Sequence, residues 1–196
     1  MSDRDELARR LSSEDADEAG RALGELIGQG RDATPALVEA ARSDSADARS
    51  LAMEGLGTVA DPAALDAVRE GLRDSDGRVR SLAAVALRRL GDPGARDALV
   101  ATLDDWPDVL HSHLSRSAYE LPALGEDALE PVVPLLDSEE WADRAKAAWI
   151  VSTVVSQADG GSLDELGRIL DGYDPDGDPQ DRGRRAREAA EWLRRR

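Results

Sequence analysis

The stretch that decides the fold is residues 76–105, which read DGRVRSLAAVALRRLGDPGARDALVATLDD. Apolar residues recur every three or four positions on both sides of Gly91-Asp92-Pro93, and this is the period of an amphipathic helix. Gly is common just after a helix. Asp followed by Pro is common at the start of the next one, because the carboxylate accepts a free backbone N–H and Pro has none to satisfy. The stretch therefore predicts two antiparallel helices joined by a short turn.

The same pattern occurs 31 residues earlier. The matching positions share size, charge and turn chemistry: Arg49 with Arg80, Ala52 with Ala83, Leu56 with Leu87, Asp61-Pro62 with Asp92-Pro93, and Leu72 with Leu103. Arg144 matches Arg80 again at an offset of 64. Repetition of a helix pair at this period is typical of an α-solenoid. We interpret Arg49, Arg80 and Arg144 as structural residues that bind the preceding turn and nearby acidic residues, with ligand binding as the alternative.

Extending the repeat along the chain predicts one all-α domain over residues 1–196, with about five helix pairs. We expect a cap helix at 1–12, repeats at 13–43, 44–74, 75–105, 106–137 and 138–172, and an acidic loop with a C-terminal cap helix at 173–196. Ser13 and Thr34 are expected to be N-caps, and Ser162 is expected to form a capping box with Glu165. Pro134 is expected to shorten or kink its helix.

Composition limits the classes of function. The chain has 196 residues, no Cys and a net charge of −16, so disulfides and thiolate chemistry are excluded and polyanions are repelled. Nucleic acid is therefore not an expected partner. The N-terminus is polar, which predicts no signal peptide, and no apolar run approaches the length of a membrane span. We expect a soluble, cytoplasmic protein.

The repeats resemble HEAT repeats, most closely the short type found in phycobilisome-lyase-like proteins. The residues that carry the resemblance are Asp76 to Arg80, Ala83, Ala86-Leu87, Leu90 to Pro93, Ala95, Ala98-Leu99, Leu103 and Asp105. The resemblance implies a right-handed superhelix of helix pairs, in which the second helix of each pair lines the concave face. It is specific for fold and uninformative about activity, because the family is defined by packing residues.

Few residues suggest chemistry. His111 and His113 are the only histidines, and a two-residue step places them on different sides of a helix, so we expect no metal site from them and no cofactor. We interpret Trp106, Trp141 and Trp149 as packing residues between repeats, with stacking on a ligand as the alternative.

Two charged segments near the C-terminus leave alternatives open. The loop from Asp174 to Asp181 has the alternate Asp spacing of a calcium loop, but Pro179 and Arg185 stand where Gly and Glu are required. The simpler interpretation is an acidic connector. Residues 182–196 contain seven Arg and two Glu, which either pair with acidic neighbours of the same chain or dock an acidic partner.

The main functional hypothesis is a non-catalytic protein-binding scaffold. Second-helix positions that the repeat leaves free form an acidic row beside a partly apolar one, and exposed apolar positions in a groove suggest a partner contact. The predicted binding residues are Asp66, Arg69, Arg73, Asp97, Val100, Asp104, Glu130 and Val133. The expected partner is another protein with a basic patch. The alternatives are a bilin or chromophore lyase-like subunit, which the resemblance allows, and a purely structural array.

Overall fold

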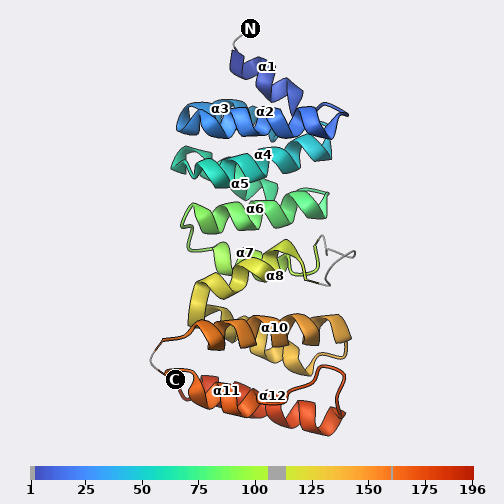
Figure 1. Ribbon diagram of the computed structural model, residues 1–196, viewed down its shortest axis with the longest axis vertical. Helices are drawn as coiled ribbons and strands as arrows, with labels where there is room; N and C mark the ends of the chain where they lie inside the picture. The colour runs from blue at the N-terminus through green and yellow to red at the C-terminus, as the bar shows by residue number, and fades with distance from the viewer. Residues whose placement is uncertain (1–2, 106–113, 160) are drawn as a thin grey trace. The chain divides into compact units, whose positions relative to one another are not determined.

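The computed structural model describes residues 3–105, 114–159 and 161–196, and every regular element in these residues is a helix (Figure 1). The chain divides into two compact units, Met1–Trp106 and Pro107–Arg196. The predicted all-α class, built of helix pairs, is confirmed. No helix in the described residues combines the length and the apolar character that crossing a bilayer requires.

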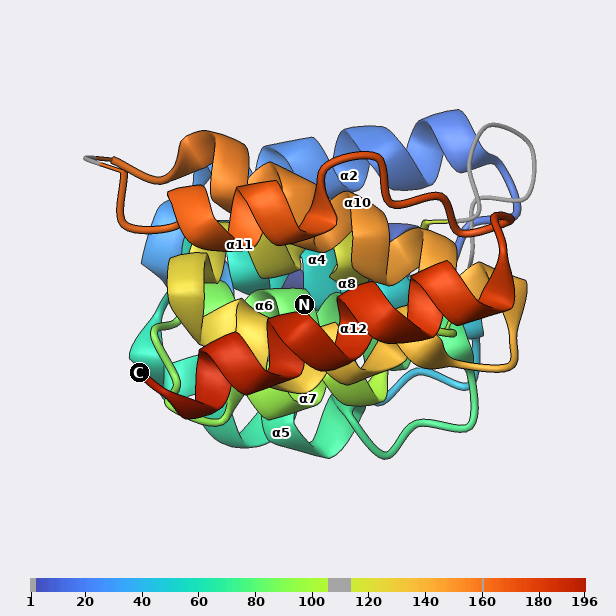
Figure 2. The same cartoon turned by 90° about the horizontal axis from the view of Figure 1, so that it is seen from below.

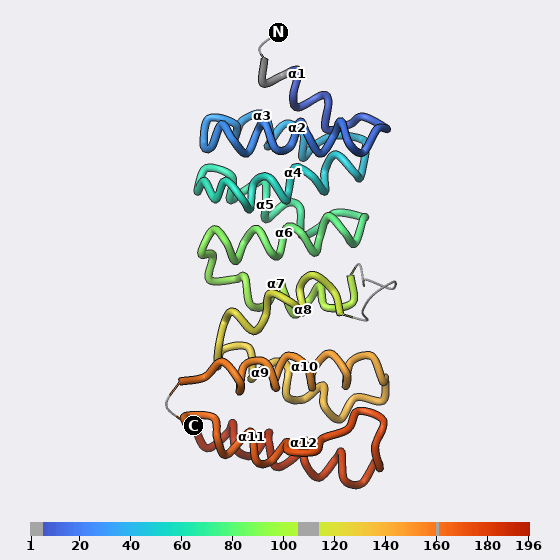
Figure 3. The backbone as a smooth tube through the Cα atoms, viewed as in Figure 1, coloured from blue at the N-terminus to red at the C-terminus, as the bar shows by residue number. Residues whose placement is uncertain are grey.

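The first unit contains a cap helix and three helix pairs. Helix α1 is Asp3–Arg10. The pairs are α2 (Ala16–Gly28) with α3 (Thr34–Ala40), α4 (Ala46–Val59) with α5 (Leu65–Gly71), and α6 (Gly77–Arg89) with α7 (Ala95–Ala101). Short 3-10 segments, η1 (Gly30–Ala33) and η2 (Pro62–Ala64), lead into α3 and α5. The chain reverses direction after each helix, as the backbone trace shows (Figure 3).

Capping by short polar side chains sets the start of each first helix. Asp15, Ser45 and Asp76 are the N-caps of α2, α4 and α6, and each accepts backbone N–H groups of the first turn. The prediction of Ser13 as N-cap is wrong. Its hydroxyl donates to Glu18 at 2.8 Å, and the Asp15 carboxylate takes the cap because a negative charge also complements the helix dipole.

Thr34 is also not an N-cap. It is the first residue of α3, Ala33 precedes it as the cap, and the Thr34 hydroxyl donates to Asp61 of the next repeat at 2.8 Å. The Asp-Pro turns behave as predicted. Asp61 accepts the backbone N–H of Ala63 at 3.2 Å, and Asp92 accepts that of Gly94 at 2.8 Å.

First helices stack on one another in this unit. Helix α4 packs between α2 and α6, while α3 and α5 pack against the first helix of the following pair. Helices α4 and α6 approach closely through their backbones, since a Cβ on Gly57 would lie 2.9 Å from the Cα of Ala86. Leu26, Leu37, Leu56 and other fully buried aliphatic side chains fill the core. A core poor in aromatic residues is possible because small side chains let the helices pack closely.

The recurring arginines link consecutive turns, as the structural interpretation predicted. Arg49 donates to the carbonyls of Ser43 and Asp44 at 3.0 Å each, and its other nitrogens bind Asp74 at 2.7 and 2.8 Å. Arg80 repeats the arrangement with the turn behind it and with Asp105 ahead, at 2.8 and 2.5 Å. We call this series of contacts the arginine ladder.

The second unit is less regular. Its elements are α8 (Arg116–Glu120), η3 (Leu121–Ala128), α9 (Leu129–Val132), η4 (Val133–Asp137), α10 (Trp141–Gln157), α11 (Asp164–Leu170) and α12 (Pro179–Arg194). The predicted interruption at Pro134 is confirmed, because α9 ends at Val132 and the chain continues as the 3-10 segment η4. Helix α10 packs against η3 and η4, and α12 lies beside α11 and also contacts η4 (Figure 2).

Arg144 keeps the contacts of the repeat in this unit, whereas the start of α11 departs from the prediction. Arg144 continues the arginine ladder. It donates to the carbonyls of Ser138, Glu139 and, in place of a carboxylate ahead, Pro175, at 2.9, 2.7 and 2.8 Å. The expected capping box at Ser162 is wrong, since α11 starts one residue later with Leu163 in the cap position and no side-chain bond to the cap.

Candidate functional site

The predicted binding residues of the first unit lie on its second helices. Asp66 and Arg69 are on α5, Asp97 and Val100 are on α7, and both helices lie on the same side of this unit (Figure 2). Asp66 and Asp97 are exposed, and Val100 is half-buried. The structure thus puts acidic side chains next to a partly covered apolar one on this face.

Arg69 is held by the neighbouring repeat. Its guanidinium binds the Asp92 carboxylate at 2.6 Å, and the Asp92 side chain is only 5% exposed. Asp97 pairs with Arg96 at 3.1 Å on the surface, where such a pair contributes little. Arg69 therefore bridges two repeats, and its charge is already compensated by an inward-facing carboxylate.

Arg73 and Asp104 follow these helices. Both are exposed, and Arg73 donates to the Arg69 carbonyl at 3.4 Å. Arg73 also lines a cavity of about 480 Å³ together with Arg42, Glu70 and the Arg49–Asp74 pair. The charges in this cavity are mixed, so it does not by itself select a charged ligand.

The two predicted binding residues of the second unit differ in their exposure to solvent. Glu130 is exposed on α9. Val133 is fully buried and is therefore removed from the predicted surface. The equivalence between Val133 and Val100 breaks because Val133 is the first residue of the 3-10 segment η4, whereas Val100 lies inside the α-helix α7.

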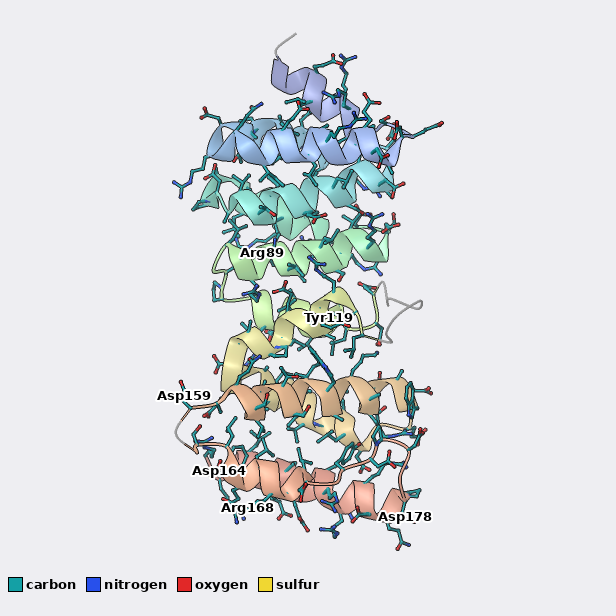
Figure 4. The ribbon with its side chains drawn as sticks, in the orientation of Figure 1. Arg89, Tyr119, Asp159, Asp164, Arg168 and Asp178 are labelled. Atoms are coloured by element: carbon teal, nitrogen blue, oxygen red, sulfur yellow. The ribbon has the colours of Figure 1, made fainter. Side chains whose placement is uncertain are left out.

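Sequence reasoning missed an apolar cavity in the second unit. Its volume is about 390 Å³, and the residues that line it are Leu136, Ala148, Trp149, Val151, Ser152, Val155, Ser156, Gly167, Leu170 and Tyr173. The cavity lies between α10 and α11. Trp149 and Tyr173 contribute its aromatic surface, and Tyr119 on α8 packs edge-on against Trp149 with ring centroids 5.2 Å apart (Figure 4).

The aromatic residues of this unit are grouped in space rather than in sequence. Aromatic residues make up 3% of the chain, yet Trp149 and Tyr173 line one cavity and Tyr119 contacts Trp149. The distance between α10 and α11 has no sequence signature, because it depends on how the connecting segment is folded. Trp149 thus packs against Tyr119 of the preceding repeat, in line with the predicted role between repeats, and also faces a cavity.

The hydroxyl of Tyr173, which lines the cavity, is bound to the main chain. It donates to the Leu136 carbonyl at 2.5 Å. Burial raises the pKa of Tyr173 above its usual value, while the positive charges of Arg182 and Arg144 act in the opposite direction. Tyr173 is therefore a neutral hydrogen-bond donor at physiological pH.

The described residues contain no group of three or more His, Asp or Glu side chains that could hold a metal ion. In the loop from Asp174 to Asp181 the carboxylates serve the backbone and neighbouring cations. Asp174 accepts the Asp176 N–H, Asp178 caps α12, and Asp181 binds Arg184 and Arg185. These contacts support the acidic-connector interpretation. His111, His113 and Trp106 lie outside the described residues.

The C-terminal arginines bind the chain itself. Arg185 donates to the carbonyls of Ile169 and Asp171 at the end of α11. Arg195 pairs with Glu165 at 3.5 Å, and Arg196 pairs with Glu126 at 2.9 Å and lies over the Trp192 ring. Pairing with acidic neighbours, one of the two predicted roles, therefore occurs within this unit.

Comparisons with known proteins agree with the helical-repeat fold. The family model described as HEAT repeats matches residues 34–118. Among curated proteins, no sequence matches this chain. A chain in the structure of the complex of CpcE and CpcF of phycocyanin lyase from Nostoc sp. PCC7120 is 24% identical, with a TM-score of 0.53, over 89% of this chain and 72% of that one.

Engineered and designed proteins are also among the solved structures that match this chain. An engineered protein is 20% identical with a TM-score of 0.48, over 100% of this chain and 98% of that one. A designed armadillo repeat protein, solved in complex with the peptide (KR)4, is 19% identical with a TM-score of 0.47, over 96% of this chain and 100% of that one. At these identities the likeness is one of fold, so the lyase-like role is not carried over to this chain.

Proposed function

We propose that this HEAT-repeat protein is a non-catalytic scaffold that binds a basic segment of another protein on the exposed face of α5 and α7. The observation that carries the proposal is the ion pair between Arg69 and the largely buried Asp92. Because this pair compensates the cation of α5, the exposed carboxylates Asp66 and Glu70 dominate the charge of that helix.

The neighbouring helix supports the same partner chemistry. Asp97 is exposed on α7, and Val100 lies one turn further on the same face, half-buried. An acidic rim beside an apolar position suits a partner segment in which basic residues flank an aliphatic one, since the charges steer association and the apolar contact adds affinity. The net charge of −16 favours the same class of partner.

A binding experiment with matched variants tests the proposal. The probe is a fluorescein-labelled peptide in which arginines flank a central leucine, and fluorescence anisotropy reports its affinity for the full chain. We expect affinity to fall as salt is added and to fall further in the variant Asp66→Asn/Asp97→Asn. The control, Asp17→Asn/Asp47→Asn, removes the same charge from exposed positions on α2 and α4 and should change affinity less.

The outcomes separate electrostatic binding from other modes. Equal losses in the two double variants would show that only net charge matters and would contradict a site on α5 and α7. Salt-insensitive binding that is lost in Val100→Asp would contradict the electrostatic version and leave an apolar contact. Absence of binding at low salt would contradict the proposal as a whole.

A further inference from the structure

The cavity between α10 and α11 has the construction of a small-molecule site. Its volume of about 390 Å³ lies in the range of ligand pockets. Leu136 and Val151 at its base are fully buried, whereas Ser152 and Ser156 are exposed. The cavity is therefore apolar inside and carries its hydroxyl groups where it meets solvent.

Each of the three hydroxyl groups that line the cavity donates its proton to a main-chain carbonyl. Ser152 donates to the Trp149 carbonyl at 3.0 Å, Ser156 donates to the Thr153 carbonyl at 2.8 Å, and Tyr173 donates to the Leu136 carbonyl at 2.5 Å. Each hydroxyl has one proton and two acceptor lone pairs. Because the protons are engaged by the main chain, the hydroxyls offer a ligand acceptors.

The charges around the cavity determine whether a cationic or an anionic ligand is favoured there. Among the described residues that line it there is no Arg, Lys or His, so a carboxylate in the cavity would have no cation in direct contact. Ser156 is in the last turn of α10, which ends at Gln157, and the C-terminal end of a helix favours a cation. The indole of Trp149 adds an aromatic surface, which also attracts cations.

Two acidic residues flank the connection between α10 and α11, which follows Ser156 in the chain. Asp159 follows α10 and Asp164 begins α11, and both are exposed and labelled in Figure 4. Neither lines the cavity, and Asp159 lines a separate one beside η3, so they contribute only a negative charge near this end of α10. Arg144 and Arg182 act electrostatically on the Tyr173 hydroxyl, which disfavours a cation beside that hydroxyl. A bound cation is therefore placed at the Ser152 and Ser156 end.

We propose that this cavity binds a small amphiphilic amine, with its apolar ring or chain against Leu136, Val151 and Trp149 and its ammonium group at Ser152 and Ser156. The amine is a small molecule rather than a protein segment, because ten residues of one unit enclose a volume of ligand size. This site belongs to the second unit, whereas α5 and α7 belong to the first, and it does not depend on the proposed scaffold function.

Three compounds that differ only in their terminal group test the charge preference. The probes are phenylbutylamine, phenylbutanol and phenylbutyric acid, titrated into the full chain to millimolar concentration, with two-dimensional amide NMR as readout. We expect the amine to shift the signals of Gly167 and the Trp149 indole and to bind about tenfold more tightly than the acid, with the alcohol between them.

Two variants test the location. Gly167→Leu fills the cavity, since even a Cβ there lies 3.1 Å from a Val155 methyl group, and should abolish binding of the amine. Gly24→Leu is the matched control on α2, where a Cβ meets nothing within 4 Å. Should Gly167→Leu fail to fold, Ser152→Ala/Ser156→Ala removes only exposed hydroxyls and should reduce the preference for amine over acid.

Each contrary result overturns a stated part of the proposal. If none of the three compounds shifts these signals, the cavity is not a ligand site. If the acid binds as tightly as the amine, the assignment of an ammonium ligand is wrong. If the amine binds Gly167→Leu as well as it binds the parent chain, the site lies elsewhere.

Discussion

Arg80 donates hydrogen bonds in two directions. Behind it are the carbonyls of Asp74 and Ser75, and ahead of it is the Asp105 carboxylate, which it binds with two nitrogens. The planar guanidinium makes these contacts together, which the single ammonium group of Lys is unable to do. Arg80 therefore fixes the turn before α6 relative to the turn after α7.

We expect Arg80→Ala to lower the free energy of unfolding by about 2–3 kcal/mol, because it removes the partner of a mostly covered carboxylate and of two carbonyls. Arg80→Lys should recover less than half of that loss. Arg42→Ala is the control, since the Arg42–Glu39 pair is well exposed and should contribute about 0.5 kcal/mol or less. Urea unfolding followed by circular dichroism measures all three. Similar losses for Arg80→Ala and Arg42→Ala would contradict a structural role for the ladder.

Asp74 makes part of the stability dependent on pH. Hydrogen bonds from Arg49 hold the pKa of Asp74 below its usual value, although burial acts in the opposite direction. A carboxylate with a lowered folded pKa stabilises the protein above its unfolded pKa of about 4 and loses that contribution as the pH falls through the folded pKa.

The free energy of unfolding should therefore decrease between about pH 5 and pH 2 more steeply in the parent chain than in Asp74→Asn. Arg49→Gln should resemble Asp74→Asn, because either change removes the pair. Urea titrations at a series of pH values supply the measurement. Parallel pH profiles for the parent and both variants would rule out this carboxylate as a source of the acid sensitivity.

Helix α4 meets α6 at a glycine. A Cβ on Gly57 would lie 2.9 Å from the Cα and 3.0 Å from the Cβ of Ala86. A backbone neighbour has little freedom to move, so a methyl group there would push the two first helices apart. The helical repeat thus requires a very small residue at this crossing.

We expect Gly57→Ala to destabilise the protein by about 1–3 kcal/mol through overpacking. Gly24→Ala is the matched change in α2, where the added methyl group has open space, and it should stabilise by about 0.5–1 kcal/mol through helix propensity. Thermal or urea unfolding of both variants provides the comparison. A stabilising effect of Gly57→Ala would show that the crossing is looser than described.

The elements were predictable where the repeat is regular. The offset of 31 residues located the helix pairs of the first unit and the arginine ladder, because packing and turn positions recur in the sequence. Exact caps were not predictable, as Ser13 and Asp15 are both good N-caps and tertiary context chose between them. Val133 was misplaced because the chain changes from α-helix to 3-10 helix at Val133 itself, which the regular repeat does not predict.

The net negative charge is a property of the whole chain rather than of one residue or element. It has 41 acidic and 25 basic residues, and local ion pairs compensate only part of the excess. Like charges that remain on a folded surface repel one another and favour expansion. This global term was fully predictable from composition. The cavity between α10 and α11 was not, because it depends on a helix spacing that no residue pattern records.

We therefore expect the melting temperature to rise by several degrees as sodium chloride increases from about 10 mM to about 0.5 M, since salt screens the repulsion. Circular dichroism at fixed pH measures the effect. The ladder pairs are partly covered and should lose little over this range. A melting temperature that falls with salt would mean that attractive surface pairs outweigh the net repulsion.

The spacing of the arginine ladder has a consequence for how such a chain can grow. Arg49 binds Asp74 and Arg80 binds Asp105, each 25 residues ahead, while the repeat is 31 residues long. A tandem duplication of any 31-residue segment in this region therefore copies donor and acceptor together, and every internal arginine finds its carboxylate again. The last copy is followed by the same residues as the original segment, so lengthening the array by whole repeats creates no new end that has to be closed.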